Sequence, residues 1–315
     1  MSETVALVPD RREQSFDAFA ATAVDRFDDA VVARGSGSTA SPSRRIPAAL
    51  RRPLVAASIL WLAVVVIAAL WPALLAPGDP LGGTPADNLQ APSPAHLFGT
   101  DQLGRDLYTR VVHGTALTVS AAAIAVAVGV VVGSLIGLVS GFVGGRTDAV
   151  LMRVADVLLA IPGLLLSLAI ITALGFGTVN VAIAVGIASV ASVARVLRSE
   201  VLRVRTAPYV EAARASGNGW IAVLLRHVLP NSIAPVAVLA VLEFGTAILA
   251  VSALSFLGYG APPPAPEWGA LVSGGRDYLR TAWWLTALPG LAIAVTVLAA
   301  NRLSRGLDSE GRARR

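Results

Sequence analysis

Six long apolar segments dominate this sequence, and each is long enough to cross a lipid bilayer. A helix that spans about 30 Å of hydrocarbon needs about 20 mostly apolar residues. The segments cover residues 53–75, 116–143, 154–174, 179–194, 233–257 and 283–300, and the uncharged run of the short fourth one extends back to Gly175. Only 14% of the residues are charged, against roughly a quarter in soluble domains. The sequence therefore predicts an all-α membrane protein with six transmembrane helices.

The arginines are distributed unequally along the chain, and their placement predicts the orientation of the helices. All 25 basic residues are Arg, and only four of them lie on the side that holds the connections after the first and fifth segments. These four are Arg105, Arg110, Arg276 and Arg280. The positive-inside rule then places both termini and residues 197–231 in the cytoplasm of a bacterium, with the chain crossing its plasma membrane several times. The excess of Arg on the cytoplasmic side accounts for the pI of about 10.6 without a nucleic-acid partner.

The residue inventory excludes several kinds of chemistry. The chain has no cysteine and no lysine, so disulfides, thiol nucleophiles and Schiff bases are impossible, as is a phosphate-binding loop of the GxxxxGK[ST] type. The three histidines form no metal-ligand pair such as HExxH. We therefore predict no metal site, no catalytic residues and no nucleotide site in this chain, which excludes an intramembrane enzyme.

The composition divides the chain into three parts. Residues 1–52 are rich in Ser, Ala, Asp and Arg and include "ARGSGSTASPSRR", which is typical of a flexible linker. Their apolar residues between Phe16 and Val31 follow a helical period, which predicts at most one transient helix. Residues 53–307 form the transmembrane domain, with a cytoplasmic loop at 197–231. Residues 308–315 form a cytoplasmic tail.

Four glycines recur every four residues in the second apolar segment. They are Gly129, Gly133, Gly137 and Gly141. Small residues at this spacing form one ridge on a helix and allow the backbone of a second helix to approach closely. The pattern predicts helix packing.

Two polar segments lie on the predicted outer side. The first contains "HLFGTDQLGRDLYTRVVHG", where Thr100 or Asp101 could cap a helix and where the spacing of Asp106 and Arg110 suits a surface ion pair. The second, "GYGAPPPAPEWGALVSGGRDYL", is irregular because of its prolines. The predicted role is docking of an outer partner or substrate, by Asp101, Arg105, Asp106 and Trp268. The alternative is a structural one, a capped helix and a lid that closes the bundle.

Two acidic residues fall inside apolar segments, where a functional role is the first hypothesis because such residues are costly there. Glu243 is near the middle of the fifth segment. It could bind the amino terminus of a peptide or another cation in a translocation path, or it could serve as a hydrogen bond between helices. For Asp156, near the end of the third segment, we favour a structural pairing with Arg153 or a nearby loop over a place in the path. Pro162 and Pro289 are expected to kink their helices.

A short helix is predicted within the loop that follows the fourth segment. Thr206 and Pro208 favour a helix start, and Gly217 favours its end. The Ala-rich sequence between them has high helix propensity and little bulk, and Glu211 complements the helix dipole. The sequence predicts a stiff helix over about 207–216 that could enter a groove on a partner. The alternative is a surface helix without a partner.

This stretch resembles the EAA loop of ATP-binding-cassette importer permeases. The matching residues are Glu211, Ala212, Ala213, then Gly217 after three residues, then Leu229 and Pro230. The family often has Ile two residues before Leu-Pro, where this chain has His227. Residues 96–106, 148–162, 253–260 and 268–279 extend the resemblance, which covers about 53–307. Together they resemble the second permease subunit of the dipeptide, oligopeptide and nickel branch.

The resemblance implies an importer-permease bundle of the MetI-like fold. It implies that the loop residues Glu211, Ala212, Ala213, Arg214, Gly217, Leu229 and Pro230 contact an ATPase. The implied partners are a homologous permease, two ATP-binding-cassette ATPases that bind ATP and Mg, and an extracytoplasmic substrate-binding protein. The expected substrate is a di- or oligopeptide, with nickel, glutathione or another small solute as alternatives. A proton-coupled secondary transporter that uses Glu243 is a further alternative, although no inverted repeats are evident.

Overall fold

The structure is a computed structural model that describes residues 53–313, with side chains described up to Gly306. The predictions for residues 1–52, and for the last two residues of the tail, lie outside the described residues. Residues 53–313 contain helices and loops, with two isolated β-bridges, Gly83 to Arg105 and Thr100 to Asp106, and no longer strand. The prediction of an all-α protein is confirmed. Five helices are long and apolar enough to cross a membrane, or six if one bent pair counts as a single span.

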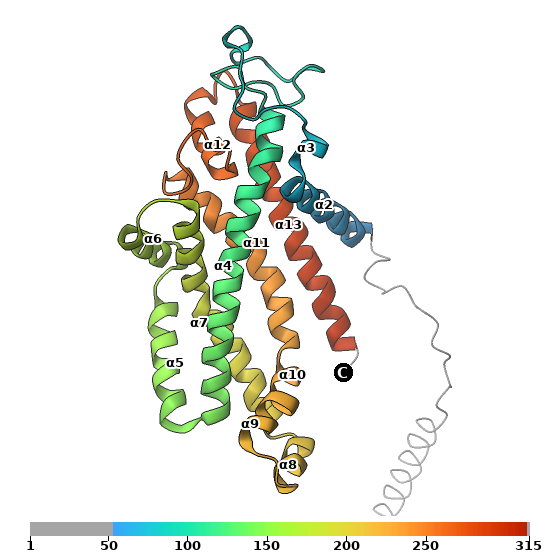
Figure 1. The fold of residues 1–315 in the computed structure, drawn as a ribbon, viewed down its shortest axis with the longest axis vertical. Helices are drawn as coiled ribbons and strands as arrows, with labels where there is room; N and C mark the ends of the chain where they lie inside the picture. Colours follow the sequence, from blue (N-terminus) through green and yellow to red (C-terminus); the bar gives the residue numbers. More distant parts are fainter. Residues whose placement is uncertain (1–52, 314–315) are drawn as a thin grey trace, which may run out of the picture. The chain divides into compact units, whose positions relative to one another are not determined.

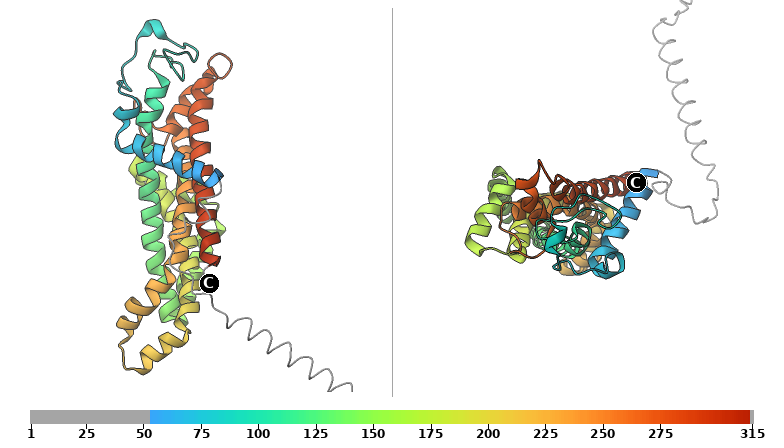
Figure 2. Two further views of the ribbon diagram at one scale, coloured as in Figure 1. Left: turned by 90° about the vertical axis from the view of Figure 1, so that its right-hand side faces the viewer. Right: turned by 90° about the horizontal axis from the view of Figure 1, so that it is seen from above.

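Four long helices run side by side and form the body of the described region (Figures 1 and 2). They are α4 (Leu107–Val143), α7 (Thr178–Arg205), α11 (Ala234–Phe256) and α13 (Trp284–Ala313). Helix α4 packs along α7 and α11, and α11 packs along α13. Helix α13 contains Pro289 without interruption, and it continues through residues 308–313 of the predicted tail.

The third predicted span is broken into two helices. Helix α5 (Gly145–Ala160) and helix α6 (Gly163–Leu174) meet at an angle of 97°. Ile161 has extended backbone angles, φ −93° and ψ 129°, as expected for a residue before a proline. Pro162, which has no N–H, adopts φ −54° and ψ 128°. Pro162 therefore does more than kink a span, since the chain turns sharply there.

Helix α2 (Pro53–Leu70) differs from the other long helices in direction. It is followed at Trp71 by the short helix α3 (Pro72–Leu75), so the predicted segment 53–75 is two helices. In Figures 1 and 2, α2 is steeply inclined to the long axes of α4 and α13, against which it packs. Many of its apolar side chains are exposed, including Leu54, Leu60 and Leu70.

The short helices gather at the two ends of the body (Figure 1). One end, the α12 end, holds η2 (Pro85–Asp87), α12 (Trp268–Gly275) and η4 (Arg276–Tyr278). The other end, the α8 end, holds α8 (Pro208–Ala215), α9 (Trp220–Val223), η3 (Leu224–Val228) and α10 (Leu229–Ser232). Residues 197–205 of the predicted loop continue α7 as helix.

Candidate functional site

The four glycines of the second apolar segment lie on the face of α4 that packs against α7. All four are buried. A Cβ at Gly133 would lie 2.7 Å from the Val190 carbonyl oxygen, and one at Gly137 would lie 2.4 Å from that of Ala194. Any side chain at these positions would therefore push the two backbones apart. A Cβ at Gly186 of α7 would likewise lie 2.7 Å from the Ala125 carbonyl oxygen of α4. The sequence analysis missed Gly186 because it is a single glycine without a repeat.

Helix α8 projects from the body at the end that carries α9 and α10 (Figure 1). It occupies Pro208–Ala215, within one residue of the predicted bounds at each end. Pro208 is the first helical residue, where its missing N–H costs nothing. Glu211, Ala212 and Arg214 are exposed, whereas Val210 is fully buried. The helix thus presents a small-residue face with two opposite charges and is anchored by one apolar side chain.

The C-terminus of α8 is closed by a Schellman motif. Gly217 adopts φ +81°, a left-handed conformation that favours glycine. The Gly217 N–H donates to the Arg214 carbonyl at 3.0 Å, and the Asn218 N–H donates to the Ala213 carbonyl at 3.3 Å. The Asn218 side-chain amide donates to the same Ala213 oxygen at 2.9 Å. These bonds satisfy the carbonyls that a helix end leaves free, so α8 has a defined end.

An apolar cluster fixes the base of α8. Val210 packs in it with side chains from α7, α9, η3 and α11. The remaining buried members are Val193, Leu197, Val201, Val204, Val223, Val228 and Val236. On the flank, the Arg214 guanidinium lies 5.8 Å from the Phe142 ring centroid, and this ring stacks with Trp220 at 6.2 Å. The long helices α4, α7 and α11 thus all reach the region that supports α8.

A π-helical turn precedes Pro230. Leu224–Val228 forms the wider π turn, and α10 begins at Leu229. A proline inside a helix lacks an N–H and its ring clashes with the carbonyl four residues earlier, here that of Arg226. Widening of the turn relieves this clash and lets the helical path continue toward α11. Leu229 is half-buried and Pro230 is exposed, so the Leu-Pro pair shapes the path between α8 and α11.

A half-buried ion pair joins α5 to α7 near the α8 end, and the sequence analysis did not predict it. The Arg198 Nη2 donates to Asp148 Oδ2 at 2.6 Å, and Ser140 of α4 donates to Oδ1 of the same carboxylate at 2.5 Å. The Arg205 side chain donates to the Gly141 carbonyl at 2.8 Å. These contacts join α4, α5 and α7 beside the apolar cluster that holds the base of α8. No local sequence signal pairs residues 50 positions apart.

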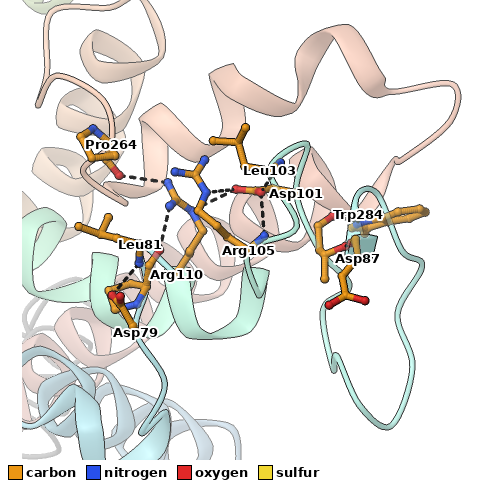
Figure 3. Close-up of polar contacts among 11 residues, drawn as sticks. Asp79, Leu81, Asp87, Asp101, Leu103, Arg105, Arg110, Pro264 and Trp284 are labelled. Atoms are coloured by element: carbon orange, nitrogen blue, oxygen red, sulfur yellow. Dashed lines mark hydrogen bonds and ion pairs between the residues drawn. The ribbon is translucent and has the colours of Figure 1, made fainter. Parts of the chain in front are cut away.

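The polar residues at the α12 end form a network that is mostly buried (Figure 3). The Asp101 carboxylate accepts from the Leu103 and Arg105 N–H groups at 2.9 and 3.0 Å and from Arg105 Nε at 2.7 Å. Arg110 lies 3.6 Å from the same carboxylate and donates to the carbonyls of Pro80 and Pro264, at 2.9 and 3.2 Å. Arg110 therefore joins three loop segments.

Two expectations for this region are corrected. The cap of α4 is Asp106, which accepts from the Thr109 N–H at 2.8 Å, and neither Thr100 nor Asp101 caps it. Asp106 pairs with His96 at 3.0 Å and not with Arg110. The reason is that the Asp106 carboxylate is used to cap α4, while the Arg110 guanidinium is held by Asp101 and the two loop carbonyls.

Trp268 is also interior. It is 2% exposed, and its indole N–H donates to the Val111 carbonyl at 2.9 Å. The fully buried Glu267 before it caps α12 by accepting from the Gly269 and Ala270 N–H groups, both at 3.2 Å. Burial raises the pKa of Glu267 above its ordinary value, and these hydrogen bonds oppose part of that rise because they stabilise the charged carboxylate. With Asp101 and Arg105 also buried, docking of a partner at this end stays a prediction that depends on the surrounding exposed loops.

The two intramembrane acids have different surroundings. Asp156 pairs with Arg195 of α7 at 2.6 Å, not with Arg153, and both side chains are about half exposed. The expectation of pairing with Arg153 is wrong because α5 packs on α7. Glu243 lines a hollow of about 340 Å³ together with residues of α4, α6 and α7. Within residues 53–306, no group of three or more His, Asp or Glu side chains is placed to hold a metal ion.

The chain is similar to known membrane transport proteins over most of its length. Residues 129–310 match the family described as binding-protein-dependent transport system inner membrane component. The chain is 40% identical over 255 residues to the di/tripeptide transport system permease protein DppC of Pseudomonas aeruginosa, covering 79% of this chain and 84% of that protein. It is 41% identical over 258 residues to the glutathione transport system permease protein GsiD of Shigella flexneri, covering 82% and 85%.

A dipeptide transport system permease protein DppC of Alkalihalophilus pseudofirmus is 37% identical over 242 residues, covering 77% of this chain and 80% of that protein. Among solved structures, a chain described as "Crystal structure of an amino acid ABC transporter with histidines" superposes with a TM-score of 0.50 and 18% identity. The superposition covers 63% of this chain and 92% of that chain, and at this identity it shows a shared fold.

Proposed function

The chain belongs to the family of binding-protein-dependent transport system inner membrane components, and from that membership we propose how it takes part in solute import. It is a permease subunit of an ATP-binding-cassette importer and a multi-pass protein of the bacterial plasma membrane. Two of the relatives described above are named as permeases for di/tripeptides and for dipeptides, and one as a permease for glutathione. We infer that this chain passes short peptides, a class that includes glutathione.

The exposed helix α8 is the proposed contact with an ATPase subunit, and its geometry is the observation that carries the proposal. The residues that would enter a groove are Glu211, Ala212, Ala213 and Arg214, at the tip of the part of the chain that projects from the α8 end. Small side chains allow close approach, and Glu211 lies where the helix dipole favours a negative charge. The Schellman motif at Gly217 and the buried Val210 make the helix a rigid extension of the body.

Motion of this helix would pass into the long helices by direct packing. Val210 contacts the apolar cluster that includes residues of α7 and α11, and Leu229 and Pro230 shape the connection into α11. To shift a two-state transporter from mostly one state to mostly the other takes about 5.5 kcal/mol of differential interaction. In this proposal, that free energy comes from ATP and Mg bound to two ATPase subunits, because the chain lacks the lysine of a phosphate-binding loop.

The remaining partners and the orientation follow from the same proposal. A homologous permease completes the translocation path, and an extracytoplasmic binding protein delivers the peptide at the α12 end. The α8 end and both termini then face the cytoplasm, in agreement with the positive-inside rule. Family membership favours ATP-driven import over a proton-coupled mechanism.

The test is to reconstitute this chain with the homologous permease, the two ATPase subunits and the binding protein, using Glu211→Ala and, separately, Gly217→Pro. Proline cannot adopt a φ of +81° and has no N–H for the Arg214 carbonyl. Neither change touches a long helix, so insertion should survive. We expect peptide uptake to fall sharply, with ATPase activity either lost or no longer stimulated by loaded binding protein.

The matched control is Gly219→Ala, where an added Cβ meets no atom within 4 Å, and it should leave both activities unchanged. The affinity of the binding protein for its peptide should stay constant in every variant. Normal uptake and normal ATPase stimulation in both Glu211→Ala and Gly217→Pro would show that α8 is not the coupling element.

A further inference from the structure

Glu243 is an acidic side chain in the middle of a membrane helix, and it has no cationic partner among residues 53–306. It lies two residues from Gly245, the central residue of α11. The three other acidic residues within α5, α7 and α11 are Asp148, Asp156 and Glu200, and each lies within 2.6 Å of an arginine nitrogen. None of the Arg or His side chains of residues 53–306 comes within ion-pair distance of Glu243. A charge at this depth is costly without a partner or water.

The two hydroxyl groups beside Glu243 contact its carboxylate only at long hydrogen-bond distance. Ser192 Oγ and Thr246 Oγ1 each lie 3.3 Å from a carboxylate oxygen. The same hydroxyls lie closer to backbone carbonyls, 2.8 Å for Ser192 to Ser189 and 2.9 Å for Thr246 to Glu243 itself. Each hydroxyl has a single proton to donate, and the shorter contacts use it. The carboxylate therefore has free acceptor capacity.

The carboxylate and these hydroxyls line an open hollow of about 340 Å³. Its other polar lining residues are Ser167 and Ser189, and the rest are small or aliphatic side chains. Thr246 is exposed and Glu243 half-buried, so the hollow opens to the surface of this chain. Since a water molecule occupies about 30 Å³ of liquid, the hollow has room for a small cationic group and its hydration.

We propose that this hollow is a transit site for the α-ammonium group of a passing peptide, an inference that rests on the proposed function. An ammonium group has three donors and no acceptor. Glu243, Ser192 and Thr246 offer it three acceptors of the needed kind, one of which carries the compensating charge. The site lacks a second charge and any fixed donor, so it binds weakly enough for the peptide to leave, as a transit site must.

The electrostatic test uses the absence of cysteine from this chain. Ala188→Cys places a thiol on the wall of the hollow. The assembled transporter is put in nanodiscs, and the thiol is treated with a trimethylammonium methanethiosulfonate or a sulfonate one of similar size. We expect the cationic reagent to react faster than the anionic one. Glu243→Gln should lower the ratio of the two rates by on the order of tenfold, because it removes a nearby unit charge.

Two controls make the ratio specific. Gly219→Cys, an exposed position at the α8 end, should give a rate ratio that Glu243→Gln does not change. Glu243→Asp should keep most of the ratio, since it keeps the charge. Glu243→Gln is expected to insert and assemble, because a neutral amide costs less in hydrocarbon than a carboxylate.

A separate transport assay measures the uptake of trialanine that the binding protein delivers. Glu243→Gln should lower the maximal rate of uptake severalfold, Glu243→Asp should recover part of it, and Thr246→Val, which keeps the charge, should be milder than Glu243→Gln. Trialanine should also slow modification of Ala188→Cys, and this protection should weaken with Glu243→Gln. The reagent rates do not depend on import, so a failure of peptide uptake in the unmodified transporter would refute the proposed function separately.

Three results would overturn the inference. The first is no reaction of Ala188→Cys with either reagent, since the hollow would then not admit a hydrated cation. The second is a rate ratio that Glu243→Gln leaves unchanged. The third is normal trialanine uptake by Glu243→Gln despite a changed ratio, which would make the carboxylate a charge beside the path and not a transit site.

Discussion

Gly133 is the position where the packing of α4 on α7 can be tested most directly. A Cβ there would lie 2.7 Å from both the Val190 carbonyl oxygen and the Val193 Cβ, whereas ordinary contact begins at 3.4 Å. The helices would have to separate locally by about 0.7 Å, and a gap of about 0.5–1 Å forfeits a quarter to a half of each dispersion contact. We expect Gly133→Ala to cost about 1–3 kcal/mol, as overpacked positions do, and Gly133→Leu to cost more.

The assay is the thermal inactivation of the purified complex, together with recovery of the partner permease on purification. A loss of 1 kcal/mol lowers the melting temperature by about 2–4 °C for chains of 150–250 residues, so Gly133→Ala should lower it by several degrees and Gly133→Leu should prevent assembly. Val131→Leu is the matched control on the same helix, because Val131 is 58% exposed and surface changes stay within about 0.5 kcal/mol. Equal melting and equal recovery for Gly133→Leu and Val131→Leu would refute the reasoning.

Three further predictions concern the two ends of the molecule. Arg110→Met should cost about 1.5–3 kcal/mol, since it leaves the Pro80 and Pro264 carbonyls without their charged donor. Exposed Arg276→Met should change melting little, and equal melting of the two variants would contradict the network. Because burial raises the pKa of Glu267, its contribution to stability is complete below the ordinary carboxyl pKa of about 4.3 and is lost as pH rises through the raised value. Melting of the wild type should therefore fall more steeply over that window than melting of Glu267→Gln, and parallel curves would contradict it. Pro262→Cys should react with an impermeant thiol reagent in intact cells and Gly219→Cys only in opened cells; labelling of Gly219→Cys from outside would invert the proposed orientation.

The elements that the sequence predicted well are those that depend on neighbouring residues. The helix at 208–215 begins at a proline and ends at a glycine with positive φ, and both signals act over one or two residues. The apolar segments 116–143, 179–194, 233–257 and 283–300 each correspond to one helix, α4, α7, α11 and α13, because hydropathy is a property of a continuous stretch. Their ends were less certain, as α7 continues to Arg205, since a helix can leave the apolar region without ending.

The choice of partners for charged groups could not be predicted in this way. The spacing of Asp106 and Arg110 suggested an ion pair, but the Asp106 carboxylate caps α4 and Arg110 binds Asp101 and two loop carbonyls. Asp156 pairs with a residue 39 positions away. In both cases the nearest opposite charge along the chain is not the nearest in space.

The sequence by itself determined that the chain is a bundle of membrane helices with a capped projecting helix, because hydropathy, helix propensity and the special backbone preferences of proline and glycine act locally. Only the tertiary structure decided that α5 and α6 diverge by 97°, that Arg105 and Arg110 are interior, and that Glu243 faces an open hollow with no Arg or His side chain in its lining. These features depend on which helices pack together, and packing brings side chains from distant parts of the chain into contact or leaves them without a partner.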